Sequence, residues 1–211
     1  MKANIKKLVL LMIFTVIATF MMAATVTAES PGNRSIRGVY AATGSGTCFV
    51  APFGFNDNLV PNSAPDGTGA YMLMTFTMEG VFTFHRDGTG HIERPSCPTV
   101  IHNPSPFAPY PSAGNSKDSW DFTYEVERDG SITLTQVPGS HSGEFTSGPL
   151  VALGPYHNNG RNWRGTVSPD GKTIILNSGL PDIITSPPPN PEGIICNGSA
   201  VLIWQHEIDH R

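Results

Sequence analysis

Hydrophobic and polar side chains alternate along residues 71–85, YMLMTFTMEGVFTFH. The even-numbered positions carry mostly bulky apolar side chains, whereas the odd-numbered positions are mainly threonine or charged. Because successive side chains of a strand point to opposite sides, this alternation predicts a strand with one buried face. A tight turn at Gly80 would place Met78 and Val81 on the same face and break the pattern. We therefore expect one long strand that Gly80 bends, as glycine often does in barrels.

Further strands with the same period follow along the chain. The expected strands are residues 35–43, 119–127, 131–136, 162–167, 172–177 and 199–206. Three Asp-Gly dipeptides, at residues 87–88, 129–130 and 170–171, are expected between neighbouring strands. Asp-Gly readily adopts the positive φ of tight turns, so each dipeptide predicts a hairpin.

The strands and their hairpins indicate an all-β fold. About eight antiparallel strands, linked mainly by hairpins, form either an up-and-down barrel or a β-sandwich. Long bent strands and sequential hairpins favour the barrel. Proline-rich stretches at 51–69, 102–116 and 186–193 are expected to be loops, since proline cannot donate to a ladder. No domain boundary is visible, so residues 29–211 are expected to form a single β-barrel domain.

The first 28 residues have the composition of a signal peptide. Three lysines precede an uncharged apolar run, which ends in Val-Thr-Ala at residues 26–28. A basic start, an apolar centre and a small-x-small motif are the parts of a secretory signal, so we expect cleavage after Ala28. The protein is then exported to the periplasm or the medium. An uncleaved anchor is the alternative, because the apolar run is almost long enough to span a bilayer.

Removal of the leader changes the charge of the chain. The leader carries three of the thirteen basic residues and none of the seventeen acidic ones, so the remaining 183 residues have a net charge of −7. No cluster of lysine or arginine remains, which argues against nucleic acid or anionic lipid as a partner. No later stretch is apolar enough to cross a membrane.

The chain has three cysteines, Cys48, Cys97 and Cys196. In an oxidising compartment two of them should form a disulfide, and three pairings are possible. Cys48 follows the first expected strand and Cys196 precedes the last one. Closure of a barrel makes these strands antiparallel neighbours, so those two ends meet and a Cys48–Cys196 bridge is favoured. Cys97, between two prolines, is then free and is expected in a loop.

The inward positions of the expected strands carry many aromatic and methionine side chains. They can line a cavity for a small apolar ligand, or they can fill the barrel completely. Their large size favours a mostly filled interior, with a pocket near one mouth. The candidate ligand-binding residues are Met72, Met74, Phe76, Phe82, Trp120, Phe122, Tyr124 and Trp163, and Met78 and Phe84 share the same face.

Segments 36–48, 79–93 and 164–176 (IRGVYAATGSGTC, EGVFTFHRDGTGHIE and RGTVSPDGKTIIL) resemble small exported bacterial proteins of calycin-like, or lipocalin-like, architecture. Gly38-Val39-Tyr40 is similar to the Gly-x-Trp motif near the first strand of lipocalins, with Tyr40 in place of tryptophan. The resemblance implies a barrel that can hold a small apolar ligand. It carries over no catalytic residue.

Residues 206–210, HEIDH, match the H-E-x-x-H pattern of zinc peptidases. That motif needs both histidines on one face of a helix, together with a third ligand. Here the five residues extend an expected strand and the printed sequence ends at Arg211, so we expect a solvated tail. His85 and His91 flank the first Asp-Gly turn and could bind a metal if the hairpin pairs them, but polar positions near a wet turn are the simpler interpretation. The sequence predicts no metal site and no cofactor.

Two other groups of polar residues contain side chains that occur in catalytic sites. GSHSGE at 139–144 lacks the spacing of a nucleophile elbow and is interpreted as a loop rich in glycine and serine. Glu125 and Glu127 are neighbouring carboxylates on the outward face of their expected strand. No acidic residue falls on an expected inward position, so a glycosidase-type pair is not supported.

Three hypotheses for function follow. The first is an exported, non-enzymatic barrel that binds a small apolar or amphipathic molecule. The second is a structural or interaction protein of the cell envelope with a solid core, whose proline-rich loops, including Pro106, Phe107 and Tyr110, contact a partner. The third is an enzyme, such as a metal-dependent hydrolase.

Overall fold

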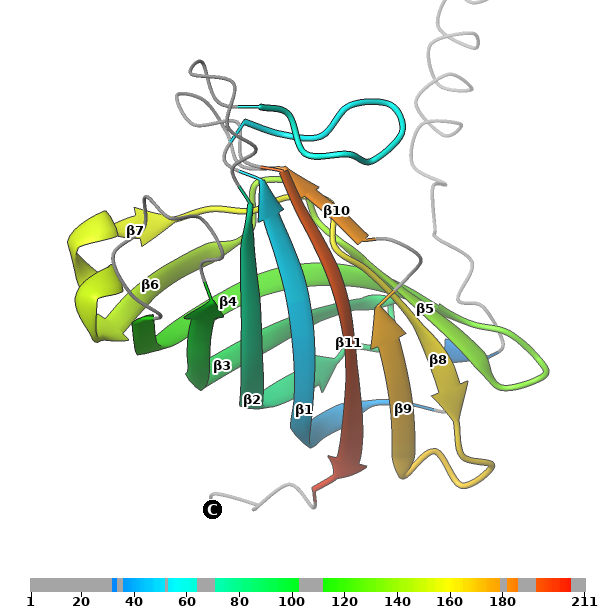
Figure 1. The fold of residues 1–211 in the computed structure, drawn as a ribbon. Helices are drawn as coiled ribbons and strands as arrows, with labels where there is room; N and C mark the ends of the chain where they lie inside the picture. The colour runs from blue at the N-terminus through cyan, green and yellow to red at the C-terminus, as the bar shows by residue number, and fades with distance from the viewer. Residues whose placement is uncertain are drawn as a thin grey trace, which may run out of the picture.

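The computed structural model describes residues 32–33, 36–51, 53–63, 71–102, 112–178, 182–185 and 193–205. These residues form eleven strands and one 3-10 helix (Figure 1). The strands are β1 (Gly38–Ala51), β2 (Met72–Phe84), β3 (Thr89–His102), β4 (Ser112–Val126), β5 (Ser131–Gln136), β6 (Ser142–Ser147), β7 (Pro155–Tyr156), β8 (Asn162–Val167), β9 (Thr173–Ser178), β10 (Asp182–Thr185) and β11 (Gly193–Trp204), and the 3-10 helix is η2 (Pro149–Leu153).

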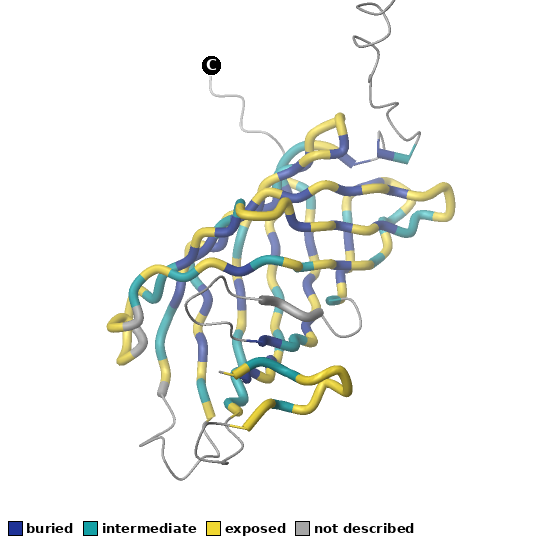
Figure 2. The backbone as a smooth tube through the Cα atoms, turned by 90° about the horizontal axis from the view of Figure 1, so that it is seen from above, coloured by how far each residue is buried: buried dark blue, intermediate teal, exposed yellow. Residues whose placement is uncertain are grey.

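Eight strands close into a ring. β1, β2, β3, β4, β5, β8, β9 and β11 each pair with the next in antiparallel fashion, and β11 pairs with β1. Since the strands follow one another around the ring in chain order, the fold is the expected up-and-down barrel of eight strands. Buried and exposed residues alternate along the strands, as Figure 2 shows, which is the expected period of two.

The other three strands extend one end of the barrel. β4 pairs with β5 through its second half and with β6 through its first half. In the same way, β11 pairs with β9 through its second half and with β10 through its first half. β7 adds to the outer edge of β6. The barrel is therefore a closed ring at one end and a wider, extended sheet at the other (Figure 1).

Several boundaries differ from the expected ones. β1 and β11 are each longer at the end where they carry the cysteines, because their pairing continues from Tyr40 opposite Trp204 to Ala51 opposite Gly193. β4 begins at Ser112, so residues 112–116 are strand and not loop. β6, β7 and β10 were not expected, since they are short and lack a clear alternation of bulky residues.

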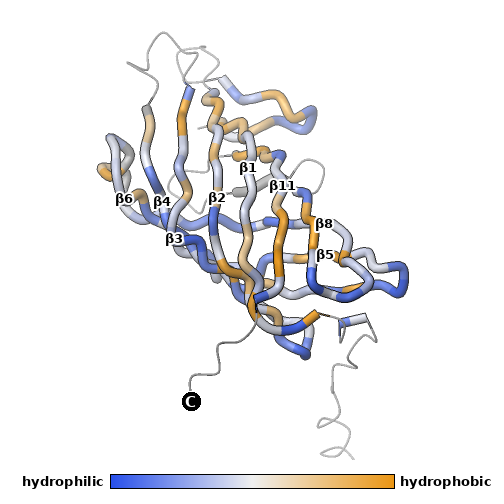
Figure 3. The backbone as a smooth tube through the Cα atoms, turned by 90° about the horizontal axis from the view of Figure 1, so that it is seen from below, coloured by the Kyte–Doolittle hydropathy of each residue, from blue (hydrophilic) through white to orange (hydrophobic). Residues whose placement is uncertain are grey.

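The three Asp-Gly hairpins are confirmed. Gly88, Gly130 and Gly171 have φ angles of +84°, +84° and +69°, which favour glycine. β2 is also one uninterrupted strand, as expected. A Cβ atom at Gly80 would lie 2.6 Å from the carbonyl oxygen of Glu93, so this position needs glycine for the close approach of β3. All three turns lie at the same end of the barrel, and Figure 3 shows hydrophilic turns around that end.

The end with the Asp-Gly turns is filled by aromatic rings, and we call it the packed half. Phe84 is at its centre, with ring centroids 5.2 Å from Tyr40, 5.2 Å from Phe122 and 5.1 Å from Tyr124, all edge-to-face. Such pairs add to the free energy gained from burial alone. Ile36, which precedes β1, is fully buried against the same cluster.

The polar ends of these rings have hydrogen-bond partners. The Tyr124 hydroxyl donates to the carbonyl oxygen of His85 at 2.6 Å, and the Tyr40 hydroxyl donates to that of Gly171 at 2.6 Å. Burial raises the pKa of Tyr40 to about 12. Asn33 accepts a hydrogen bond from the Val126 N–H at 2.8 Å and so ties the segment before β1 to β4. The hydroxyl groups of Tyr40 and Tyr124 in the packed half therefore have carbonyl partners.

The opposite end carries the disulfide. Cys48 of β1 and Cys196 of β11 are directly opposite in the register and are bonded, which confirms the favoured pairing. A disulfide is compatible with an exported protein. The leader, residues 1–28, lies outside the described residues. Within the described part of the chain, no helix is long and apolar enough to span a membrane.

Candidate functional site

A cavity of about 720 Å3 lies between the packed half and the disulfide. Its lining comes from one level of six neighbouring strands, β4, β3, β2, β1, β11 and β9. Six adjacent strands of a barrel can surround one space only on their concave side, so the cavity lies inside the barrel. We call this end the cavity half. The volume falls within the usual range of small-molecule sites.

Small inward residues leave this space open. Gly46, Gly114 and Gly198 lie at the level of the cavity on β1, β4 and β11. Gly46 is opposite Gly198, and a Cβ atom at Gly46 would lie 2.6 Å from the ring of Phe76. The Phe76 ring therefore rests on the backbone of β1 and forms one wall. Thr99, which is 4% exposed, supplies a hydroxyl group from β3.

The eight candidate ligand-binding residues do not form one site. Phe76 lines the cavity, and Met72 and Met74 pack with the disulfide in a small cluster beside it. The other five, Phe82, Trp120, Phe122, Tyr124 and Trp163, are at most 5% exposed and belong to the main core. The interior formed by the described residues is thus mostly filled beside the cavity, and ligand binding by these residues stays a prediction.

A bulge in β3 brings unexpected side chains into the interior beside the cavity. Arg94 is opposite Asp118 and Cys97 is opposite Ser116, so β3 has one residue more than β4 between these pairs. The extra residue reverses the alternation, and both Arg94 and Cys97 point inward as a result. Asn115 stabilises the bulge, since its side-chain oxygen accepts the Cys97 N–H at 2.8 Å. The expectation that Cys97 lies in a loop is wrong: it is free and buried within β3.

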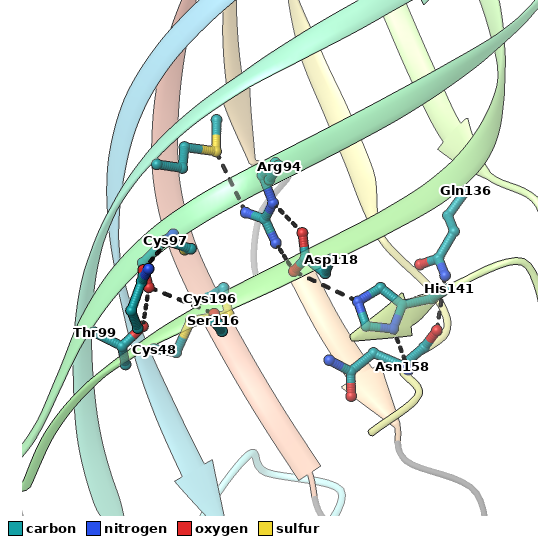
Figure 4. Close-up of polar contacts among 12 residues, drawn as sticks. Cys48, Arg94, Cys97, Thr99, Ser116, Asp118, Gln136, His141, Asn158 and Cys196 are labelled. Atoms are coloured by element: carbon teal, nitrogen blue, oxygen red, sulfur yellow. Dashed lines mark hydrogen bonds and ion pairs between the residues drawn. A yellow bond between two sulfur atoms is a disulfide. The ribbon is translucent and has the colours of Figure 1, made fainter. Parts of the chain in front are cut away.

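Arg94 and Asp118 form a buried ion pair (Figure 4). Nε and Nη2 of Arg94 donate to the two carboxylate oxygens of Asp118, and the side chains are 3% and 2% exposed. Burial opposes ionisation of Asp118, but Arg94 and the His141 side chain outweigh it and hold the pKa of this carboxyl well below its usual range. The expectation of no inward acidic residue is therefore wrong. Asp118 directly precedes the strand expected at 119–127 and has the same inward phase.

His141 extends this ion pair toward β6. Its side chain is fully buried, and its Nε2 lies 3.7 Å from Oδ2 of Asp118. Nδ1 accepts the backbone N–H of Asn158 at 3.1 Å, so the proton of the neutral ring is on Nε2 and faces Asp118. Burial lowers the pKa of His141, although Asp118 acts in the opposite direction. The interpretation of residues 139–144 as a Gly/Ser loop holds for residues 139–141 but not for 142–144, since β6 begins at Ser142, and His141 is buried in the core.

Aromatic rings cover the charged groups. The Cζ atoms of Arg94 and Arg161 lie 4.6 and 4.7 Å from the centre of the Trp120 ring. Cations this close to an indole ring are attracted to its face. The His141 ring lies between Trp120 and Tyr156, with centroid distances of 5.8 and 5.5 Å. We call Arg94, Asp118, His141 and Trp120 the charged cluster.

A row of polar groups connects the charged cluster with the cavity. The Tyr156 side chain is beside that of Ser116, and burial raises the pKa of the Tyr156 phenol. Ser116 and Thr99 both donate to the carbonyl oxygen of Cys97, at 3.5 and 3.0 Å. Burial also raises the pKa of the Cys97 thiol, which favours its neutral form. The wall formed by β3 and β4 is therefore polar, whereas the neighbouring strand β2 carries Phe76, paired with Thr99, and the methionines.

The candidate metal ligands are not brought together. The hairpin pairs His91 with Thr83, not with His85, and His91 Nδ1 lies 2.7 Å from Asp121 on the outer face. Across the described part of the chain, no group of three or more His, Cys, Asp or Glu residues could hold a metal ion. Residues 206–210, HEIDH, lie outside the described residues. Glu125 and Glu127 are exposed, as expected.

The arrangement suits binding more readily than acid–base catalysis. Both ring nitrogens of His141 face protein groups, and the Asp118 carboxylate is already paired. What remains toward the cavity is a set of hydroxyl groups, backbone atoms and apolar surface. In comparisons with known proteins, no family model and no curated protein sequence matches this chain.

Proposed function

We propose that this protein is an exported, non-enzymatic β-barrel that binds one small amphipathic molecule inside its cavity half. The observation that carries the proposal is the interior cavity of about 720 Å3, which lies where three inward positions are glycine. Small inward side chains leave this space beside an otherwise filled core, and it is large enough for a small molecule. The mixed lining suits a molecule with both polar and apolar parts.

Export to the periplasm or the medium is part of this proposal. The basic and apolar leader with its cleavage motif supports it, as does the disulfide between Cys48 and Cys196. Residues 36–48, 79–93 and 164–176 resemble calycin-like proteins, and this resemblance implies a barrel that can hold a small apolar ligand, which agrees with the proposed role.

Native mass spectrometry of protein purified from an exporting host tests the proposal first. The intact mass should correspond to residues 29–211 with two protons lost for one disulfide. A co-purifying small organic molecule at one copy per chain would support the proposal. The observed mass of such a molecule would also limit its identity.

Cavity filling provides the second test. Thr99→Phe should weaken saturable binding of 1-anilinonaphthalene-8-sulfonate at least about tenfold, since the added ring occupies the cavity. Thr123→Phe, on the exposed face of β4, is the matched control and should bind the probe as the wild type does. If the wild type shows neither saturable binding nor a co-purifying molecule, the binding function is wrong.

An envelope interaction protein is the second candidate, and an apolar surface on the outside of the barrel favours it. Val81, Ile175, Val201 and Ile203 are 39–56% exposed. Ile203 is opposite Ala41, which is opposite Val81, and Ile175 is opposite Val201, so these side chains form one patch on β2, β1, β11 and β9. Ile203→Lys should abolish such an interaction and leave probe binding intact. The loop residues Pro106, Phe107 and Tyr110 lie outside the described residues.

A further inference from the structure

One guanidinium nitrogen in the charged cluster has only a weak hydrogen-bond acceptor. Arg94 uses Nε and Nη2 for Asp118, while its Nη1 points to Sδ of Met78 at 3.4 Å (Figure 4). A thioether sulfur accepts hydrogen bonds poorly. Among the described residues, Met78 provides the one acceptor found for Nη1, although the Arg94 side chain is only 3% exposed.

The buried position makes this weak contact costly. A charged donor taken out of water loses its hydration. A hydrogen bond to a strong acceptor normally offsets this free-energy cost. The backbone supports the placement of Arg94, because its Cγ atom crosses Gly80 of β2 within 3.0 Å of where a Cβ atom would lie. The guanidinium is therefore held inside the barrel with one donor group directed away from Asp118.

Met78 lies between this donor and the cavity. Phe76 and Met78 are consecutive inward residues of β2, and Phe76 lines the cavity. The end of the Met78 side chain covers Gly44 of β1, where a Cβ atom would lie 2.8 Å from its Cε. Methionine is flexible and unbranched, so it can leave its position without movement of the backbone.

We propose that the ligand of the cavity is an amphipathic anion whose carboxylate replaces Sδ of Met78 as the acceptor for Nη1 of Arg94. This inference rests on the proposed binding function. Met78 then fills the anion position in the free protein, and the apolar part of the ligand lies against Phe76. The Asp118 carboxylate repels the incoming anion, but both of its oxygens are engaged by Arg94, and the Arg161 guanidinium lies against the same Trp120 ring.

A series of ten-carbon ligands tests the charge preference. Decanoate, 1-decanol and decylamine differ only in the polar end, and their affinities are measured by calorimetry at pH 7.5. We expect decanoate to bind at least about tenfold more tightly than 1-decanol, because hydrogen bonds to charged groups are the stronger ones. Decylamine should bind most weakly.

A double variant assigns the preference to Arg94. Arg94→Met combined with Asp118→Leu replaces the whole ion pair by apolar side chains, a change that buried pairs often tolerate. It should still bind 1-decanol, but the preference for decanoate should fall below about twofold. His91→Ala with Asp121→Ala is the matched control, since this pair joins the same two strands on the outer face, and the preference should remain.

A measurement on the wild type does not depend on the folding of any variant. Carbon-13 NMR of carboxyl-labelled decanoate follows the titration of the bound acid. Pairing with Arg94 should lower its pKa below that of the free acid, whereas burial without a cation should raise it. Equal binding of decanoate and 1-decanol, or a raised pKa, would overturn the anion site and leave the cavity function intact. If none of the three ligands binds the wild type, the proposed function itself fails.

Discussion

Five long strands, β1, β2, β3, β4 and β11, run through both halves of this barrel, but the interiors of the two halves differ. In the packed half, the inward side chains are aromatic, their centroids are 5.1–6.4 Å apart, and their polar atoms bond to nearby carbonyl groups. In the cavity half, the same strands carry glycine, threonine, a disulfide and the charged cluster. The comparison separates what holds the barrel together from what is available for binding.

The size of the inward residues accounts for the open space in the cavity half. Along β1 the inward positions are Tyr40, Ala42, Gly44 and Gly46, so the side chains become smaller toward the cavity. β11 shows the same order in the other direction, from Gly198 through Ala200 to Leu202. The barrel widens where the side chains shrink, and the space between them is the cavity.

The largest expected effect on stability comes from a substitution in the packed half. Phe84→Ala removes the ring at the centre of the aromatic cluster, and the surrounding rings cannot collapse into the space. We expect a loss of about 4 to 5 kcal/mol in the free energy of unfolding, measured by urea denaturation. Phe76→Ala is the comparison in the cavity half, and its cost should be less than half as large, since this ring already borders a cavity. Equal costs would mean that the two halves are packed alike.

The next largest effect on stability comes from a substitution in the charged cluster. Asp118→Leu leaves Arg94 buried without its carboxylate, and we expect a loss of about 3 to 4 kcal/mol in the free energy of unfolding. Adding Arg94→Met should recover most of this loss, because no buried charge then remains unpaired. A double variant that is as unstable as Asp118→Leu alone would show that packing, and not charge, causes the loss.

The packed half could be predicted from the sequence, whereas the charged cluster could not. Strict alternation and three Asp-Gly turns determine the hairpins, and large apolar side chains follow the period of two. Pro95 and Pro98 suggested a loop in the middle of β3. Proline is tolerated there because Pro95 lies at the bulge, where the regular ladder is interrupted.

Arg94 is in phase with the buried Ile92, but no inward phase was predicted for residues 89–102, so this charge was missed. The bulge shifts the phase of β3 by one residue after Arg94, so that Cys97 and Thr99 face inward, and no sequence period reports such a shift. His141 was hidden for another reason, since its neighbours are glycine and serine, which usually indicate loops. The glycines at 44, 46 and 198 were a usable signal, because small inward residues at one level of several strands indicate open space.

Removal of the disulfide should affect the cavity half alone. Replacement of Cys48 and Cys196 by alanine removes a cross-link between residues 148 positions apart. We expect the free energy of unfolding to fall by about 2 to 3 kcal/mol. Hydrogen exchange should become faster at the amides of residues 48–50 and 194–196, while those of residues 40–42 keep their protection. Faster exchange throughout β1 would indicate that the two halves unfold as one unit.

The smallest expected effect is the response of the charged cluster to pH. His141 has a lowered pKa in the folded protein, so the unfolded chain takes up a proton first as the pH falls below about 6.5, and stability decreases from there. Asp118, whose pKa is also lowered, keeps its contribution until the pH falls below about 3.8 and then loses it. The groups that face His141 are Asp118, Arg94 and Arg161, and the two cations oppose its protonation. Urea denaturation should therefore give a lower free energy of unfolding at pH 5 than at pH 7.5. This difference should disappear in His141→Gln and remain in His102→Gln, whose residue lies at the exposed end of β3. A decrease of the same size in the His141 variant would assign the pH dependence to groups outside the charged cluster.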